Sequence, residues 1–237
     1  MANNTDKALN SPQNTPKPKS VAREYIEAII FALIIALLIR SFIVQAFKIP
    51  SGSMKNTLLI GDHILVSKFT YGIHIPNEIP FTSIKLFPDI RLFPHDPNRG
   101  DIIVFKYPKN ESRDFIKRVT GVPGDKIQLI RQKLYVNDQP VEEPYAIHID
   151  PAGNKLQSPR DDFGPIIVPQ GHLFMMGDNR ENSQDSRFWG FLNIDKVKGR
   201  AFVIYWSWDR ESNWFRFERL NQTLREDTPI ATIKGGG

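Results

Sequence analysis

The chain contains no cysteine among its 237 residues, which excludes disulfide bonds and metal sites with cysteine ligands. Histidine is scarce as well. The five histidines show neither a paired metal-ligand spacing nor a His-Glu-x-x-His motif, so we expect no metal and no other cofactor. The net charge of +5 comes from no long block of lysine or arginine, and nucleic acid is therefore not an expected partner.

Long apolar runs are also absent, with one exception at residues 26–44. This run of nineteen residues carries charges only at Glu27 and Arg40, and the twelve residues between those two charges are all apolar. As a helix the run spans about 28 Å, close to the thickness of the hydrocarbon core of a bilayer. A buried core helix should show one polar face, and a cleaved signal peptide should end at a small-residue cleavage site, but neither feature is present. We therefore expect an uncleaved transmembrane anchor over residues 26–46, in contact with phospholipid.

The first 25 residues are rich in Asn, Pro, Ser and Lys and almost free of apolar side chains, which is typical of a disordered tail. Lys17, Lys19 and Arg23 precede the anchor and outnumber the basic residues that follow it closely. By the positive-inside rule, this bias favours a cytoplasmic N-terminus with the bulk of the chain on the outer side of the membrane.

After the apolar run the pattern becomes that of a mainly β protein. Gly-Asp dipeptides precede β-branched runs, and Gly-Asp is a turn signal because Gly supplies unusual dihedral angles and Asp binds its own backbone. The expected strands are residues 63–68, 102–105, 126–130 and 202–206, with a hairpin over 133–141 about Asn137 and Asp138.

Three other segments have no such pattern. Residues 69–98 hold five prolines among many apolar residues, and either pack over the core or dock on the membrane surface. Residues 150–169 are expected to form an exposed loop. Residues 221–237 are expected to form a flexible C-terminus.

The stretch Ile49–Met54 contains the first candidate for chemistry. Two serines flank Gly52 there, and we expect the glycine to let the backbone bend tightly and present the next residue. A serine on such a bend acts as a nucleophile if a base lies within hydrogen-bond reach. A plain Ser/Gly turn accounts for the same residues, so the assignment depends on finding the base.

Two kinds of base are possible. One is a histidine, of which His63 is nearest in sequence. The other is a lysine made neutral by burial. If residues 115–119 form a strand, Lys117 shares a face with Phe115 and Val119, and desolvation among apolar groups lowers the pKa of a lysine. A lysine that extends from an edge strand into solvent is the alternative.

Several motifs follow the apolar run in a fixed order: Pro50–Met54, Gly61–Lys68, Arg99–Phe105, Ile116–Val119 with Pro123–Asp125, and Gly177–Gly190. Together they resemble bacterial type I signal peptidase, the leader peptidase family of Ser/Lys serine proteases. The resemblance covers residues from about 21 to 220. One departure is visible, because Asn56 stands where many members have proline, and we expect it to alter local rigidity rather than chemistry.

The resemblance implies a role for each matched residue. Ser53 is the nucleophile, Lys117 the general base and Ser183 the residue that binds and orients that base, while Ser51 and the backbone N–H of Ser53 form the oxyanion hole. The implied ion pairs around the site are formed by Arg118, Asp178, Asp185 and Arg187. The implied pockets for small substrate side chains are lined by Phe47, Ile49, Met54, Val104, Phe115 and Ile116.

The resemblance also implies the architecture and the activity. A transmembrane helix would precede an external, antiparallel β catalytic core over residues 47–125 and 171–220, with a smaller β subdomain inserted at 126–170. The enzyme would be a single-pass protein of the bacterial cytoplasmic membrane that removes signal peptides from exported preproteins after small residues. Two alternatives stay open: a Ser/Lys peptidase dedicated to one substrate, and a catalytically silent, membrane-tethered binding domain.

Overall fold

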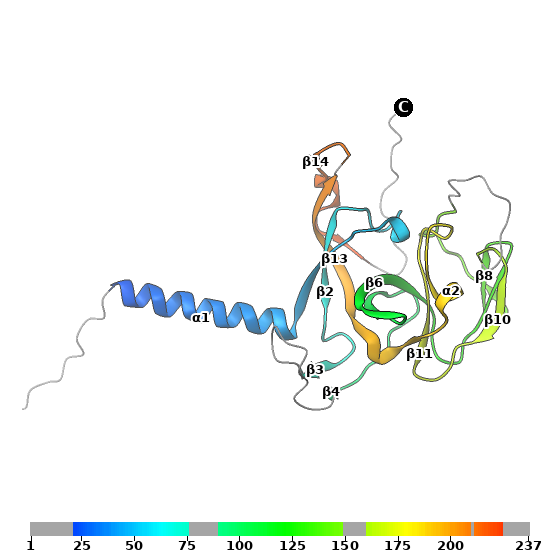
Figure 1. Ribbon diagram of the computed structural model, residues 1–237, viewed down its shortest axis with the longest axis horizontal. Coiled ribbons are helices and arrows are strands. Elements are labelled where there is room, and N and C mark those ends of the chain that lie inside the picture. The colour runs from blue at the N-terminus through cyan, green and yellow to red at the C-terminus, as the bar shows by residue number, and fades with distance from the viewer. Residues whose placement is uncertain (1–20, 76–89, 149–159, 210, 225–237) are drawn as a thin grey trace, which may run out of the picture. The chain divides into compact units, whose positions relative to one another are not determined.

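The computed structural model describes residues 21–75, 90–148, 160–209 and 211–224, and the chain divides into two compact units, residues 1–38 and 39–237 (Figure 1). Helix α1 (Val21–Phe42) begins five residues before the predicted anchor of 26–46 and ends four residues before its end. The helix stops early because the chain from Val44 onward is extended and pairs with another strand. The described residues contain no helix that is long and apolar enough to cross a membrane.

The second unit is built from short strands, a four-residue helix and 3-10 turns. The short helix is α2 (Ser186–Trp189), and the 3-10 turns lie at Gly52–Met54, Ile194–Lys196 and Phe217–Arg219. The strands are β1 (Val44–Lys48), β2 (Asp62–Ser67), β3 (Ile73–Ile75), β4 (Ile90–Leu92), β5 (Ile102–Tyr107), β6 (Asn110–Gly121), β7 (Lys126–Ile130), β8 (Lys133–Val136), β9 (Gln139–Pro140), β10 (Phe163–Ile167), β11 (His172–Met176), β12 (Leu192–Asn193), β13 (Val197–Asp209), β14 (Trp214–Phe215) and β15 (Gln222–Thr223).

The main sheet has nine strands and is antiparallel throughout. Its order is β1-β2-β13-β5-β6-β11-β12, with β14 and β15 also paired to β13. Strand β6 therefore lies inside the sheet between β5 and β11, and its second half is buried. Two apolar clusters pack against this sheet, one around Ile64, Val66 and Ile204 and the other around Phe105 and Leu173. The prediction of a mainly β, antiparallel fold is confirmed.

A second sheet of four strands, in the order β10-β7-β8-β9, falls within the residues predicted to form the smaller insertion. It has its own apolar cluster, which includes Ile127, Leu129 and Leu134. The predicted hairpin about Asn137 and Asp138 is present, and both residues have the positive φ (53° and 66°) that a tight two-residue hairpin turn needs.

Some expectations for the loops and termini differ from the structure. Part of the segment expected to be an exposed loop, residues 163–167, is strand β10. It forms because Phe163 and Ile166 pack on the apolar cluster of the second sheet. The C-terminus is ordered further than expected, since β15 pairs with β13. The hairpin of β3 and β4 belongs to the proline-rich segment. The predictions for residues 1–20, 76–89, 149–159 and 225–237 lie outside the described residues.

Candidate active site

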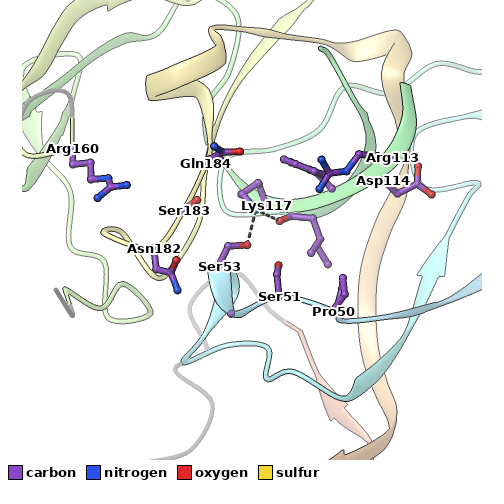
Figure 2. Close-up of a pocket in the computed structure, with 13 residues that line it drawn as sticks. Pro50, Ser51, Ser53, Arg113, Asp114, Lys117, Arg160, Asn182, Ser183 and Gln184 are labelled. Atoms are coloured by element: carbon purple, nitrogen blue, oxygen red, sulfur yellow. Dashed lines mark hydrogen bonds between the residues drawn. The ribbon is translucent and has the colours of Figure 1, made fainter. Parts of the chain in front are cut away.

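Ser53 lies in the 3-10 turn that follows β1, and core packing holds this turn in place. Met54 and Leu58 are fully buried, and the N–H of Leu58 donates to the carbonyl of Met54 at 2.7 Å. Ser53 itself is 8 % exposed and faces a cleft (Figure 2). Gly52 lies at this bend, but the bend does not depend on a glycine: its φ is not positive, and a Cβ there would make only ordinary van der Waals contacts at 4.0 Å.

Lys117 is presented by the buried half of β6, where it pairs in register with Ile103 of β5. Its ammonium nitrogen lies 5.4 Å from the centre of the Phe115 ring, so these two side chains share a face as the strand pattern predicts. The side chain does not extend into solvent, because it is only 3 % exposed.

Nζ of Lys117 lies 2.7 Å from Oγ of Ser53 and donates to the backbone carbonyl of Ile116 at 2.9 Å (Figure 2). Burial lowers the pKa of Lys117 from 10.5 to about 8, although the negative charges of Asp185 and Asp178 oppose the shift. Roughly one enzyme molecule in ten therefore carries a neutral Lys117 at pH 7. A buried amine with this pKa, in contact with a hydroxyl, can remove the proton of that hydroxyl.

Ser183 lies on the loop after β11 and lines the same cleft, next to Lys117 and Ser53 (Figure 2). Its hydroxyl is buried, and among the described residues it forms no hydrogen bond with Lys117, while its interaction with the Asp185 carboxylate helps to lower the pKa of that carboxyl. The structure thus brings Ser183 to the site without the hydrogen bond to Lys117 that the resemblance implies.

Two buried ion pairs flank the site. Arg118 follows Lys117 on β6, and its guanidinium donates to both carboxylate oxygens of Asp178, at 2.9 Å and 2.8 Å. The hydroxyl of Thr57, from the turn after Ser53, also donates to Asp178. These contacts join β6, the turn of Ser53 and the loop after β11.

Asp185 and Arg187 form the second pair, with two hydrogen bonds of 2.8 Å. Burial alone would raise the pKa of the Asp185 carboxyl, but hydrogen bonding to Arg187 and its positive charge hold the pKa below the usual value. Asp185 also accepts from the N–H of Arg187 at the start of α2 and from that of Gly177. The pair therefore fixes the loop that carries Ser183.

Sequence reasoning assigned no role to Asn179, although it lies within the last matched motif. Its backbone N–H donates to the carbonyl of Ser53, and its side-chain amide donates to the carbonyl of Gly52, both at 3.1 Å. Sequence reasoning also missed Tyr145, whose ring lies 3.7 Å from the Arg118 guanidinium carbon. Nothing in the local pattern around Tyr145 points to this contact.

The cleft around Ser53 has a volume of about 570 Å³, which is in the range of small-ligand sites. Its lining combines the turn of Ser53, β6, the loop after β11 and one residue that precedes β10: Pro50, Ser51, Gly52, Ser53, Arg113, Asp114, Phe115, Ile116, Lys117, Arg160, Asn182, Ser183 and Gln184. Ser51 is exposed there, and its hydroxyl caps no backbone N–H.

The side chains expected to form substrate pockets divide into two groups. Phe115 and Ile116 line the cleft. Ile49, Met54 and Val104 are buried in the apolar cluster under the nucleophile's turn, and Phe47 packs against that cluster. His63 lies on β2, with its ring against Tyr205, and is not among the residues that line the cleft.

The chain is similar to known proteins along most of its length. The family model for signal peptidase, peptidase S26, matches residues 22–206. The chain is 38 % identical over 229 residues to signal peptidase I of Pseudomonas aeruginosa, covering 83 % of this chain and 78 % of that protein. It is 34 % identical over 231 residues to signal peptidase I of Rickettsia typhi, covering 84 % and 87 %.

A solved structure of signal peptidase I from Enterococcus faecalis matches at 31 % identity and a TM-score of 0.38, covering 45 % of this chain and 97 % of that one. The match of the family model extends over well more than half of the chain, and the two curated relatives are each more than 30 % identical across most of their length. The chain is therefore an enzyme of the S26 signal peptidase family.

Proposed function

We propose that this enzyme removes N-terminal signal peptides from exported preproteins, with Ser53 as nucleophile and Lys117 as general base. The observation that carries the proposal is the 2.7 Å contact between Oγ of Ser53 and Nζ of Lys117, both in a cleft that opens to solvent. Lys117 is the base best placed to act, because it is in direct contact with the serine and its pKa is depressed.

In the first half of the reaction, Oγ of Ser53 bonds to the carbonyl carbon of the scissile peptide while its proton passes to Nζ of Lys117. The tetrahedral intermediate then collapses and the C–N bond breaks. Lys117 returns the proton to the leaving amine, which is the new N-terminus of the mature protein. The signal peptide remains attached to Ser53 as an ester.

In the second half, Lys117 takes a proton from a water molecule, whose oxygen attacks the ester carbonyl. The bond to Oγ breaks, and the proton passes from Lys117 to Oγ of Ser53. In both halves negative charge develops on the carbonyl oxygen, and the hydroxyl of Ser51 and the backbone N–H of Ser53 are the donors we assign to it. The exposure of Ser51 in the cleft leaves its hydroxyl available for that bond.

A cleavage assay tests this function. A purified preprotein with an Ala-x-Ala site should be cut after the second alanine, because the resemblance to signal peptidases implies pockets for small side chains. Replacing that alanine by phenylalanine or leucine should lower kcat/KM by about 10²-fold or more, since a bulky side chain would not fit a pocket of that kind. Mass spectrometry of the products identifies the bond that is cut.

Ser53→Ala is the control for this assay, and it should be inactive on the same preprotein. Efficient cleavage after phenylalanine would show that the pocket assignment is wrong. Equal activity of Ser53→Ala and the wild type would show that Ser53 is not the nucleophile. A folded wild-type protein that cuts none of several preproteins would instead favour a dedicated substrate or a silent binding domain.

We propose further that α1 attaches the enzyme to the cytoplasmic membrane, with the N-terminus in the cytoplasm and the catalytic unit outside. Apolar side chains of α1 such as Ile29, Phe31 and Leu33 are more than half exposed, and a lipid environment would cover them. The basic residues before the apolar run of residues 26–44 favour this orientation.

Protease treatment of intact spheroplasts measures this arrangement. Protease added outside should digest the catalytic unit and spare a tag at the N-terminus, and alkaline carbonate should leave the protein in the membrane fraction. Release by carbonate would mean surface attachment only. Digestion of the tag, with the catalytic unit spared, would reverse the orientation.

A further inference from the structure

The turn that follows Ser53 has a backbone conformation that proline cannot adopt. Lys55 has φ −54° and ψ 144°, Asn56 has φ +90°, and the N–H of Thr57 donates to the carbonyl of Met54 at 3.0 Å. These are the features of a type II turn with Asn56 at its third position, which requires positive φ. Proline is locked near −65°, so it cannot occupy position 56 of this turn.

The side chain of Asn56 makes a contact far away in the sequence. Its amide nitrogen donates to the backbone carbonyl of Tyr145 at 3.0 Å, across 89 positions of the chain. Tyr145 is 8 % exposed, and its ring packs against the guanidinium of Arg118, the residue after Lys117. One short chain of contacts therefore runs from the nucleophile's turn through Tyr145 to the strand that carries the base.

The segment around Tyr145 is itself held against the catalytic loop. The N–H of Ile147 donates to the carbonyl of Asp178 at 2.8 Å, and the N–H of Arg180 donates to the carbonyl of Ile147 at 3.0 Å. Asn179 lies between Asp178 and Arg180 in the sequence, and its backbone N–H donates to the carbonyl of Ser53. Glu143 accepts two further hydrogen bonds of 2.6 Å from Arg180. The segment that contains Tyr145 is therefore held in place on both sides of that residue.

We propose that Asn56 is a positioning residue, which holds the hydroxyl of Ser53 against Lys117 by joining the nucleophile's turn to the carbonyl of Tyr145. This inference rests on the proposed function, in which Ser53 and Lys117 are the reacting pair. Asn56 lies three residues after Ser53 and is not among the residues that line the cleft. Its loss should therefore slow the chemical step and leave substrate binding almost unchanged.

Asn56 has two features that matter here: its backbone has a positive φ, and its side-chain amide donates to the carbonyl of Tyr145. Two substitutions separate these features. Asn56→Gly keeps positive φ at no steric cost but removes the amide that donates to Tyr145. Asn56→Asp keeps a side chain of the same size that tolerates positive φ, but a carboxylate cannot donate to a carbonyl and repels it. Asn56→Pro, which forbids the turn itself, is a third variant that should lose stability as well as activity.

The experiment measures kcat, KM and the pH dependence of kcat/KM for each variant, on a preprotein with an Ala-x-Ala site. For Asn56→Gly we expect kcat to fall about tenfold with KM within about twofold, because a small misplacement of the nucleophile acts on the chemical step. The midpoint of the pH profile should move to higher pH, since a loosened turn admits water to Lys117 and weakens the desolvation of its amine. Asn56→Asp should lose at least as much.

Asn213→Gly is the matched control. Asn213 also has positive φ (53°), is exposed and lies outside the cleft, so its replacement should change none of these quantities. An Asn56→Gly enzyme with a lower melting temperature but the kcat and pH profile of the wild type would overturn the inference, because a purely structural role predicts that result. Ser53→Ala tests the proposed function separately: if it is inactive and Asn56→Gly is unimpaired, only the positioning role fails.

Discussion

Replacement of Lys117 by arginine is expected to abolish turnover, although it keeps the positive charge and most of the side-chain length. A guanidinium does not lose its proton in the range in which proteins are stable, so it cannot accept the proton of Ser53. General-base catalysis contributes about 10²–10⁴-fold to rates of this kind, and kcat/KM should fall by that factor. Lys117→Ala should be equally impaired, because both variants lack a base.

The wild-type enzyme provides the second half of this test. Because the neutral amine is the active form, kcat/KM should rise with pH up to the depressed pKa of Lys117 at about 8, and then level off. An ordinary lysine would place that midpoint more than two units higher. Rates are measured on one preprotein from pH 6 to 10.

Lys126→Arg is the control for this prediction, since Lys126, at the start of β7, forms an exposed ion pair with Asp138 and does not line the cleft. Its activity should equal that of the wild type. Substantial turnover by Lys117→Arg would contradict the Ser/Lys mechanism and return attention to the histidines, beginning with His63.

The second large effect is expected at Gly177, which packs closely against the backbone of Ser53 and the side chain of Ser183. A Cβ placed on Gly177 would lie 2.5 Å from the carbonyl oxygen of Ser53 and closer still to Oγ of Ser183. The carbonyl of Ser53 cannot move away cheaply, because Asn179 holds it by a hydrogen bond. Gly177→Ala should therefore displace the nucleophile's turn and lower kcat by about 10²-fold.

Gly52→Ala is the informative comparison, because it also adds one methyl group beside Ser53. There the new Cβ would meet only Asn182 and Ile60, at 4.0 Å. The kcat of Gly52→Ala should be higher than that of Gly177→Ala by about tenfold or more. Circular dichroism and melting temperatures establish that both variants are folded, and equal kcat values for the two would refute the steric argument.

The parts of the site that follow from local pattern could be predicted from sequence. The alternation around Lys117 predicts that it shares a face with Phe115, and the pair lies that way. The Gly-Asp turns predict where strands begin, and β7 begins and ends at the predicted residues. These predictions succeed because burial and turn geometry act over a few neighbouring residues.

Other parts depend on contacts between distant segments, which a single sequence does not encode locally. The ring of Tyr145 meets Arg118 only because the fold brings the end of the second sheet's segment against β6. The sign of φ at Asn56 is likewise set by the turn and by its bond to Tyr145. The start of β1 and the whole of β10 were missed because pairing with a partner strand outweighs the local pattern.

The contact between Asn179 and Ser53 has a consequence for how the enzyme is made. Ser53 and Lys117 lie in the first half of the chain. Asn179, which donates to the carbonyls of Ser53 and Gly52, lies 126 positions after Ser53 and 127 positions after Gly52. A growing chain that has only reached β6 already contains both Ser53 and Lys117, without the loop that fixes them. Closing so long a loop costs conformational entropy and slows the formation of such contacts. We therefore expect the Ser53–Lys117 pair to be positioned for cleavage only after the loop that follows β11 has been synthesised and has folded against the turn of Ser53.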